Sequence, residues 1–255
     1  MSAYHFHVKL ASDKLTLVMK LRLRHAALRV TGRDATNPDT KYFDRGAGSP
    51  EKPLHGVRVL EFPMPVTPDV LKVKLYNVLT GSTEGIEILD LRVKELQEYD
   101  LWIRPETKKW VDFAITFCQQ AGYAPTGRYF SDDGRYEIEL SDRIRNRDTG
   151  AVMFTPARVS KLTGYMEVSQ EQFRKYTVPM RFMILAHERS HFEFGTGEEI
   201  EADLNALRIY LSYGFPMTEA NYATTRIFYD KPEMIERVRQ INAFIKDFIK
   251  PAALQ

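Results

Sequence analysis

The first hundred residues show a period-two alternation of apolar and polar side chains, which is typical of β-strands with one buried face. The clearest run occupies residues 15–24, and two further runs lie at 70–79 and 86–96, separated by a segment containing Gly and Ser. Residues 31–56 are dense in Gly, Pro, Asp and Asn and are predicted to form a loop. Strands joined by such turns indicate a small antiparallel sheet or a sandwich.

The pattern changes near residue 104. Residues 108–121 place their apolar side chains at helical spacing, and Gly122 ends the run. Residues 127–168 then return to extended character, in four short segments at 128–131, 136–140, 151–154 and 164–168. The middle of the chain is therefore predicted to contain one helix followed by several short strands.

From residue 169 onward the chain is predicted to be helical. Residues 169–172 have the form of a capping box, and Pro179 is placed at the head of the next helix. A long final helix with one apolar stripe is predicted over residues 232–250. The sequence thus predicts an α+β fold, with a β-rich N-terminal domain over residues 1–104 and an α+β domain over residues 105–255.

Composition narrows the class of protein without identifying it. The chain has 255 residues, 44% of them hydrophobic and 27% charged, which excludes intrinsic disorder, and its net charge of +2 gives no support for a nucleic-acid partner. Its single cysteine, Cys118, excludes an internal disulfide. No secretory signal or membrane-spanning stretch is recognisable, so we expect a soluble, cytoplasmic protein without a membrane partner; a virion component would look the same.

The chemically informative motif is His187-Glu188-Arg189-Ser190-His191, an H-E-x-x-H pattern preceded by five apolar residues. Positions i and i+4 share one face of a helix, so both imidazoles can reach one tetrahedral Zn²⁺, with Glu188 beside it as a proton acceptor. The alternative is a pair of hydrogen-bonded histidines in the core. Because two histidines and a glutamate are costly to bury without polar partners or a metal, the motif favours a zinc site.

A catalytic zinc needs a third protein ligand, and the next helix offers several. After a tight turn at residues 195–197, this helix runs back past the histidines, and its first two turns carry Glu198, Glu199, Glu201 and Asp203. Glu199 also fits a capping box in which it would bond to the backbone of Thr196, and in that case Glu201 or Asp203 would be the ligand. On a helical wheel, Glu199 and Asp203 share one edge, which favours Glu199 as ligand and Asp203 as its supporting carboxylate.

The motif and the following Glu199-Ile200-Glu201-Ala202-Asp203 resemble the gluzincin signature, H-E-x-x-H with a downstream E-x-x-A-D. The resemblance implies a zincin-like domain in which Glu199 is the third zinc ligand and Asp203 orients His187. It covers about 25 residues of the chain. Glu199 follows His191 by eight residues, a shorter spacing than gluzincins usually have.

The leading hypothesis is therefore a zinc-dependent metalloendopeptidase acting on a protein or peptide substrate, with Glu188 as the general base. Tyr210, and also Tyr213 and Tyr222, are candidates to stabilise the oxyanion, although each fits a structural tyrosine as well. Residues 165–168 could be an edge strand that pairs with substrate, or equally a core strand. The second hypothesis is a structural or interaction protein, such as a virion or assembly component, with a structural or inactive zinc site; neither hypothesis predicts the oligomeric state.

Overall fold

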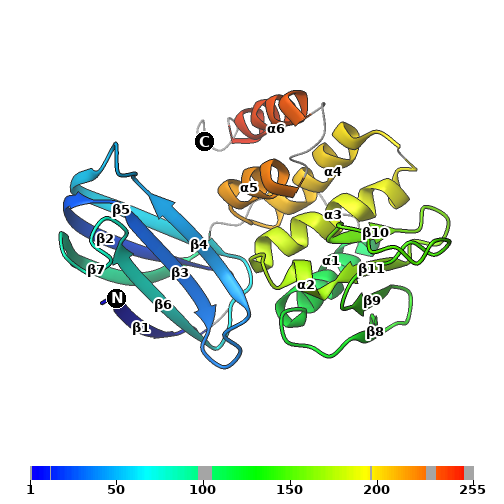
Figure 1. The fold of residues 1–255 in the computed structure, drawn as a ribbon, viewed down its shortest axis with the longest axis horizontal. Helices are drawn as coiled ribbons and strands as arrows, with labels where there is room; N and C mark the ends of the chain where they lie inside the picture. The colour runs from blue at the N-terminus through cyan, green and yellow to red at the C-terminus, as the bar shows by residue number, and fades with distance from the viewer. Residues whose placement is uncertain (1, 12, 97–104, 196, 228–233, 250–255) are drawn as a thin grey trace. The chain divides into compact units, whose positions relative to one another are not determined.

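The computed structural model describes residues 2–11, 13–96, 105–195, 197–227 and 234–249 (Figure 1). The chain divides into two compact units, Met1–Gln97 and Glu98–Gln255. The boundary predicted at residue 104 lies outside the described residues. The described part combines three sheets with six helices, which confirms an α+β fold at the level of class.

The N-terminal unit consists of two antiparallel sheets with a shared core. Their strand orders are β1-β6-β3-β4 and β5-β2-β7. The strands are β1 (Tyr4–Lys9), β2 (Leu15–Ala26), β3 (Leu28–Asp34), β4 (Lys41–Ala47), β5 (Leu54–Met64), β6 (Val70–Asn77) and β7 (Ile86–Glu95). Phe43 of one sheet stacks on Phe62 of the other at 4.3 Å between ring centroids, as expected for the predicted sandwich.

The loop predicted over residues 31–56 is wrong, because this segment holds the end of β3, all of β4 and the start of β5. Its Gly and Asp residues predict a turn, but Tyr42 and Phe43 are buried and β4 pairs with β3, with one register shift next to Gly32. Gly32 is needed within β3 because a Cβ there would lie 2.3 Å from Cζ of Phe43. In this strand glycine makes room for an aromatic side chain.

The C-terminal unit combines a four-stranded sheet of order β10-β11-β9-β8 with six helices among the described residues. The strands are β8 (Gly127–Phe130), β9 (Glu137–Ser141), β10 (Ala157–Val159) and β11 (Met166–Ser169). The helices are α1 (Pro105–Gln120), α2 (Gln170–Phe173), α3 (Val178–Glu193), α4 (Glu199–Ser212), α5 (Met217–Ile227) and α6 (Met234–Ile249). The strand predicted at 151–154 is wrong, since Val152 forms only an isolated bridge with Arg145.

The helix α3 is buried along most of its length, as the apolar run before the motif predicts. Thr177 caps it by accepting a hydrogen bond from the backbone N–H of Met180, and Pro179 lies in its first turn. Arg181 is buried but donates to the carbonyl oxygens of Phe173 and Cys118, both at 2.8 Å. The carbonyl oxygens thus satisfy a charge that would otherwise be costly in the core.

Cys118 lies in the core of this unit, as its position on the apolar side of α1 predicts. Burial raises the pKa of its thiol well above the ordinary value, which keeps it protonated and unreactive. No helix in the described ranges is both long and apolar enough to cross a bilayer.

Candidate metal centre

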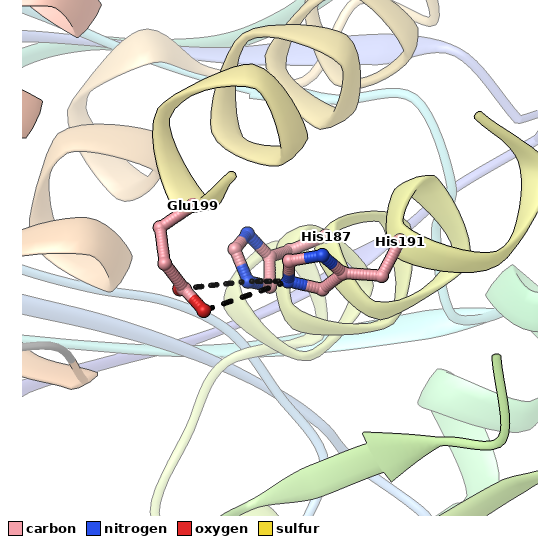
Figure 2. A group of neighbouring side chains, drawn as sticks. All are labelled: His187, His191 and Glu199. Carbon is pink, nitrogen blue, oxygen red and sulfur yellow. Dashed lines mark hydrogen bonds and ion pairs between the residues drawn. The ribbon is translucent and has the colours of Figure 1, made fainter. Parts of the chain in front are cut away.

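Two helices joined by a short turn bring together three side chains that could hold a metal ion (Figure 2). His187 and His191 lie one turn apart on α3, so their rings project from the same face, and their Nε2 atoms are 3.1 Å apart. Gly195, in the left-handed region with φ of 61°, helps to reverse the chain after α3. The following helix α4 packs against α3 and starts with Glu199, whose carboxylate faces both rings.

The distances between the ring nitrogens and the carboxylate oxygens are close to those between the donors of a tetrahedral zinc site. Glu199 Oε2 lies 3.5 Å from His187 Nε2, and Glu199 Oε1 lies 3.8 Å from His191 Nε2. With zinc–ligand bonds of 2.0–2.1 Å, tetrahedral donors are about 3.3 Å apart. The residues therefore fit a zinc ion, and the two imidazoles and one carboxylate are a donor set that zinc enzymes use.

Asp203 lies behind His187, on the side of the ring away from the other donors. Its Oδ1 is 2.9 Å from His187 Nδ1, and both side chains are almost fully buried. A carboxylate in this position holds the proton on Nδ1 and leaves Nε2 free to bind a metal. The structure thus places Glu199 facing both histidines and Asp203 behind His187, which is the arrangement that the helical wheel favours.

The surroundings of His187 favour its protonated form when no metal is bound. Burial lowers the pKa of this imidazole, but hydrogen bonds with Asp203 and Glu199, together with the charges of Asp203 and Glu188, outweigh burial and raise the pKa to about 9. A proton on His187 therefore offsets part of the negative charge gathered here. A metal ion that binds to Nε2 must displace that proton.

Glu188 adjoins this group without belonging to the set of three donors. It follows His187 on α3, is half-buried, and its charge contributes to the raised pKa of His187. A carboxylate near the metal donors but outside their set is placed to accept and donate protons. The H-E-x-x-H spacing thus brings the two histidines together and puts Glu188 close enough for its charge to act on His187.

Glu198 and Glu201, two other acidic residues at the start of α4, are not part of the donor group. Glu201 is exposed on α4, and Glu198 is the N-cap residue of that helix, with no side-chain capping bond. The capping alternative for Glu199 involves Thr196, which lies outside the described residues. Glu199 is therefore the acidic residue that the structure brings to both histidines.

Tyr210, predicted as an oxyanion-stabilising residue, has a packing role. It is fully buried, its ring stacks on Phe215 at 5.0 Å, and its hydroxyl donates to the carbonyl oxygen of Pro216 at 3.0 Å. It follows Glu199 by eleven residues on α4, which is about 16 Å along a helix axis. The alternative interpretation as a structural tyrosine describes it better.

The two other tyrosine candidates reach the surface. The Tyr213 hydroxyl is 3.4 Å from Asp112 Oδ1 of α1. Tyr222 is partly exposed on α5. Their role in stabilising the oxyanion stays a prediction.

Arg237 is the residue that sequence reasoning missed. It lies on α6 with an almost fully buried side chain, within hydrogen-bond distance of Asp203 and Glu199. One signal was available, because Arg237, Ile241 and Ile245 follow at intervals of four and all three are buried. An arginine within an apolar stripe indicates a buried acidic partner.

Comparison with known proteins adds no assignment. No protein-family model, no curated protein and no solved structure matches the chain.

Proposed function

We propose that the C-terminal unit is a zincin-like domain and that the protein is a zinc-dependent metalloendopeptidase of gluzincin type. The observation that supports this proposal best is the group of His187, His191 and Glu199: the two ring Nε2 atoms lie 3.1 Å apart, and each has one Glu199 carboxylate oxygen near it, at 3.5 Å and 3.8 Å. Asp203 behind His187 gives the site the supporting carboxylate that metal-binding histidines usually have. Glu188, the residue after His187, supplies a proton acceptor, which a purely structural zinc site does not need.

His187, His191 and Glu199 would hold the zinc ion. When bound, zinc would lower the pKa of a coordinated water and polarise the carbonyl of the scissile peptide bond. Glu188 would accept a proton from the attacking water while the water oxygen bonds to the carbonyl carbon. As the C–N bond breaks, Glu188 would return that proton to the leaving nitrogen, so that the products are a carboxylic acid and an amine.

Of the two alternatives for residues 165–168, an edge strand or a core strand, the strand order matches the core strand. The predicted substrate strand at 165–168 coincides with β11, which lies between β10 and β9 and has strand partners on both sides. The edge strands of this sheet are β10 and β8, and β10 packs against α3. We therefore propose that an extended substrate pairs with β10.

The decisive experiment combines metal analysis with one substitution. We expect about one zinc per chain in the purified protein and, for Glu188→Gln, loss of peptidase activity with zinc retained, because the amide cannot accept a proton. Glu201→Gln makes the same change at an exposed site of α4 and should leave activity intact. Activity would be measured by comparing cleavage products across a proteome-derived peptide library.

Each result has a clear meaning for the proposal. Folded protein that binds no stoichiometric zinc would refute the metal site. Zinc binding with identical product profiles for wild type and Glu188→Gln would refute the peptidase and favour the second hypothesis, a structural or interaction protein stabilised by zinc.

A further inference from the structure

A buried arginine from α6 contacts both carboxylates of the candidate metal centre. Arg237 Nε and Nη2 donate to Oδ2 and Oδ1 of Asp203 at 2.6 and 2.8 Å, and its Nη1 lies 3.1 Å from Oε2 of Glu199. The guanidinium thus bridges the carboxylate behind His187 and the carboxylate among the metal donors. Arg237 lies outside both the H-E-x-x-H and the E-x-x-A-D parts of the sequence motif.

We propose that Arg237 is a positioning residue of the metal centre, and that docking of α6 therefore sets the affinity of the centre for zinc. The inference rests on the proposed function only in that it requires the centre to bind zinc. It concerns how the donors are held, and it does not depend on the reaction that follows.

The two hydrogen bonds to Asp203 fix the plane of its carboxylate. A bidentate arginine holds both oxygens at once, which a single hydrogen bond cannot do. Oδ1 then stays 2.9 Å from His187 Nδ1, so the orientation of the imidazole depends on Arg237 through Asp203. Partners of this kind affect metal affinity because they hold the ligand in its binding orientation.

The ion pair with Glu199 further restrains a side chain that is partly exposed to solvent. Glu199 lies in the first turn of α4 and its side chain is 28% exposed, so solvent is accessible to it. Arg237 holds Oε2 within 3.1 Å, while Oε1 faces His191. A carboxylate that is already restrained loses less conformational entropy when a metal binds.

The positive charge of Arg237 lowers the affinity for zinc, because it repels a divalent cation. This repulsion opposes the gain in affinity from positioning the donors. Two carboxylates within hydrogen-bond distance offset that charge, so the group formed by Arg237, Asp203 and Glu199 carries a net negative charge. We infer that positioning outweighs repulsion, and the two effects predict opposite results on substitution.

Coupling between α6 and the metal must act in both directions. The helix α6 packs against α4 and α5 and contributes Arg237 to the centre. If docking of α6 raises the zinc affinity by some factor, bound zinc raises the docking equilibrium constant of α6 by the same factor. The C-terminal helix is therefore part of the metal-binding unit.

The first experiment compares two lysine substitutions on one helix. Arg237→Lys retains the charge and removes the planar fork, whereas Arg239→Lys makes the same change at a side chain that is 77% exposed. By competition with a chelator, we expect zinc to bind about 10–100-fold more weakly to Arg237→Lys, and Arg239→Lys to match wild type. Cobalt substitution should show an altered visible spectrum for Arg237→Lys alone, because the donor geometry changes.

Folded Arg237→Lys with zinc affinity equal to or tighter than wild type, and an unchanged cobalt spectrum, would overturn the proposal while leaving the proposed function intact. Failure of the wild-type chain to bind zinc would instead refute the metal site itself. The two failures are therefore distinguishable.

A second experiment uses the wild-type chain and does not depend on whether a variant folds. We expect zinc to slow amide hydrogen exchange along α6 as well as at α3 and α4, and to leave β2 of the N-terminal unit unchanged. Slowing that is confined to α3 and α4, with α6 unaffected, would overturn the proposal.

Discussion

The two units of the chain differ in whether their charged side chains are buried. In the N-terminal unit the buried residues of the described part are apolar or neutral, and its ion pairs lie at the surface, as between Arg22 and Glu87, which are each about half exposed. In the C-terminal unit Arg181, Asp203 and Arg237 are almost fully buried, together with both histidines of the motif. Charges are costly to bury, so a unit that gathers several of them in one place is the unit in which a chemical site is expected.

The largest effect that tests this contrast is removal of a buried charge. Arg237→Met leaves Asp203 buried without its bidentate partner, and we expect a loss of about 3–5 kcal/mol of unfolding free energy in zinc-free protein. Arg22→Met removes one partner of an exposed pair and should cost less than about 1 kcal/mol. Urea unfolding would be followed by far-UV circular dichroism for both variants.

Tryptophan fluorescence adds unit-specific information for Arg237→Met, because residues 1–97 contain no tryptophan and Trp110 is buried on α1 of the C-terminal unit. Equal losses for the two variants would contradict the contrast between buried and exposed charges.

The next effect concerns pH. The pKa of His187 is raised to about 9 in the folded, zinc-free protein, against about 6.5 for a free imidazole. The folded state therefore holds this proton more tightly, and its contribution, of the order of 3 kcal/mol, is complete below about pH 6.5 and is lost as the pH rises through about 9. Urea unfolding of chelator-treated protein at pH 6, 7.5 and 9, monitored by tryptophan fluorescence, would measure it.

Saturating zinc should change the sign of this pH dependence. Because zinc binds the neutral imidazole, zinc affinity rises with pH over the same window, and binding at pH 7.5 should release about one proton. Zinc-free protein whose stability is independent of pH between 6 and 9 would contradict the environment described for His187. His187→Gln provides the control, since it removes the group that titrates.

The smallest effect tests whether the N-terminal unit depends on packing space. Gly32→Ala would place a Cβ against the ring of Phe43, and we expect a loss of about 1–3 kcal/mol. Gly46→Ala, in the neighbouring strand β4, meets its nearest atom, the carbonyl oxygen of Leu28, at 3.7 Å and should be tolerated. Thermal unfolding by circular dichroism would compare the two variants; zinc affinity altered by Gly32→Ala would show that the units are not independent.

The grouping of the candidate metal donors could be predicted from sequence because their geometry is local. His187 and His191 are brought together by the helical period, and Glu199 and Asp203 lie in the helix that follows a short turn. Arg237 could not be assigned in this way, since its contact with Asp203 spans 34 residues and depends on where α6 packs. The sequence pattern marks such a residue only as a charge on an apolar stripe.

The errors in the fold and in the site have comparable causes. Tyr210 shares an edge of the helical wheel with Glu199, but a wheel ignores distance along the axis, and the tyrosine lies three turns away. The turn-forming residues of the segment that holds β4 predict a loop, but burial of Tyr42 and Phe43 determines its structure. The interior place of β11 depends on strand order, which periodicity does not reveal.

The wide separation of Asp203 and Arg237 also bears on the order in which the centre assembles. His187 and His191 are four residues apart, and α4 follows α3 after a short turn, whereas Arg237 must close a loop of 34 residues. Short loops close at a lower entropic cost, so a refolding chain forms the α3–α4 hairpin before α6 docks. During that interval the three donors are present but not yet restrained, and an ion that arrives early meets an open, adaptable hairpin instead of a finished site.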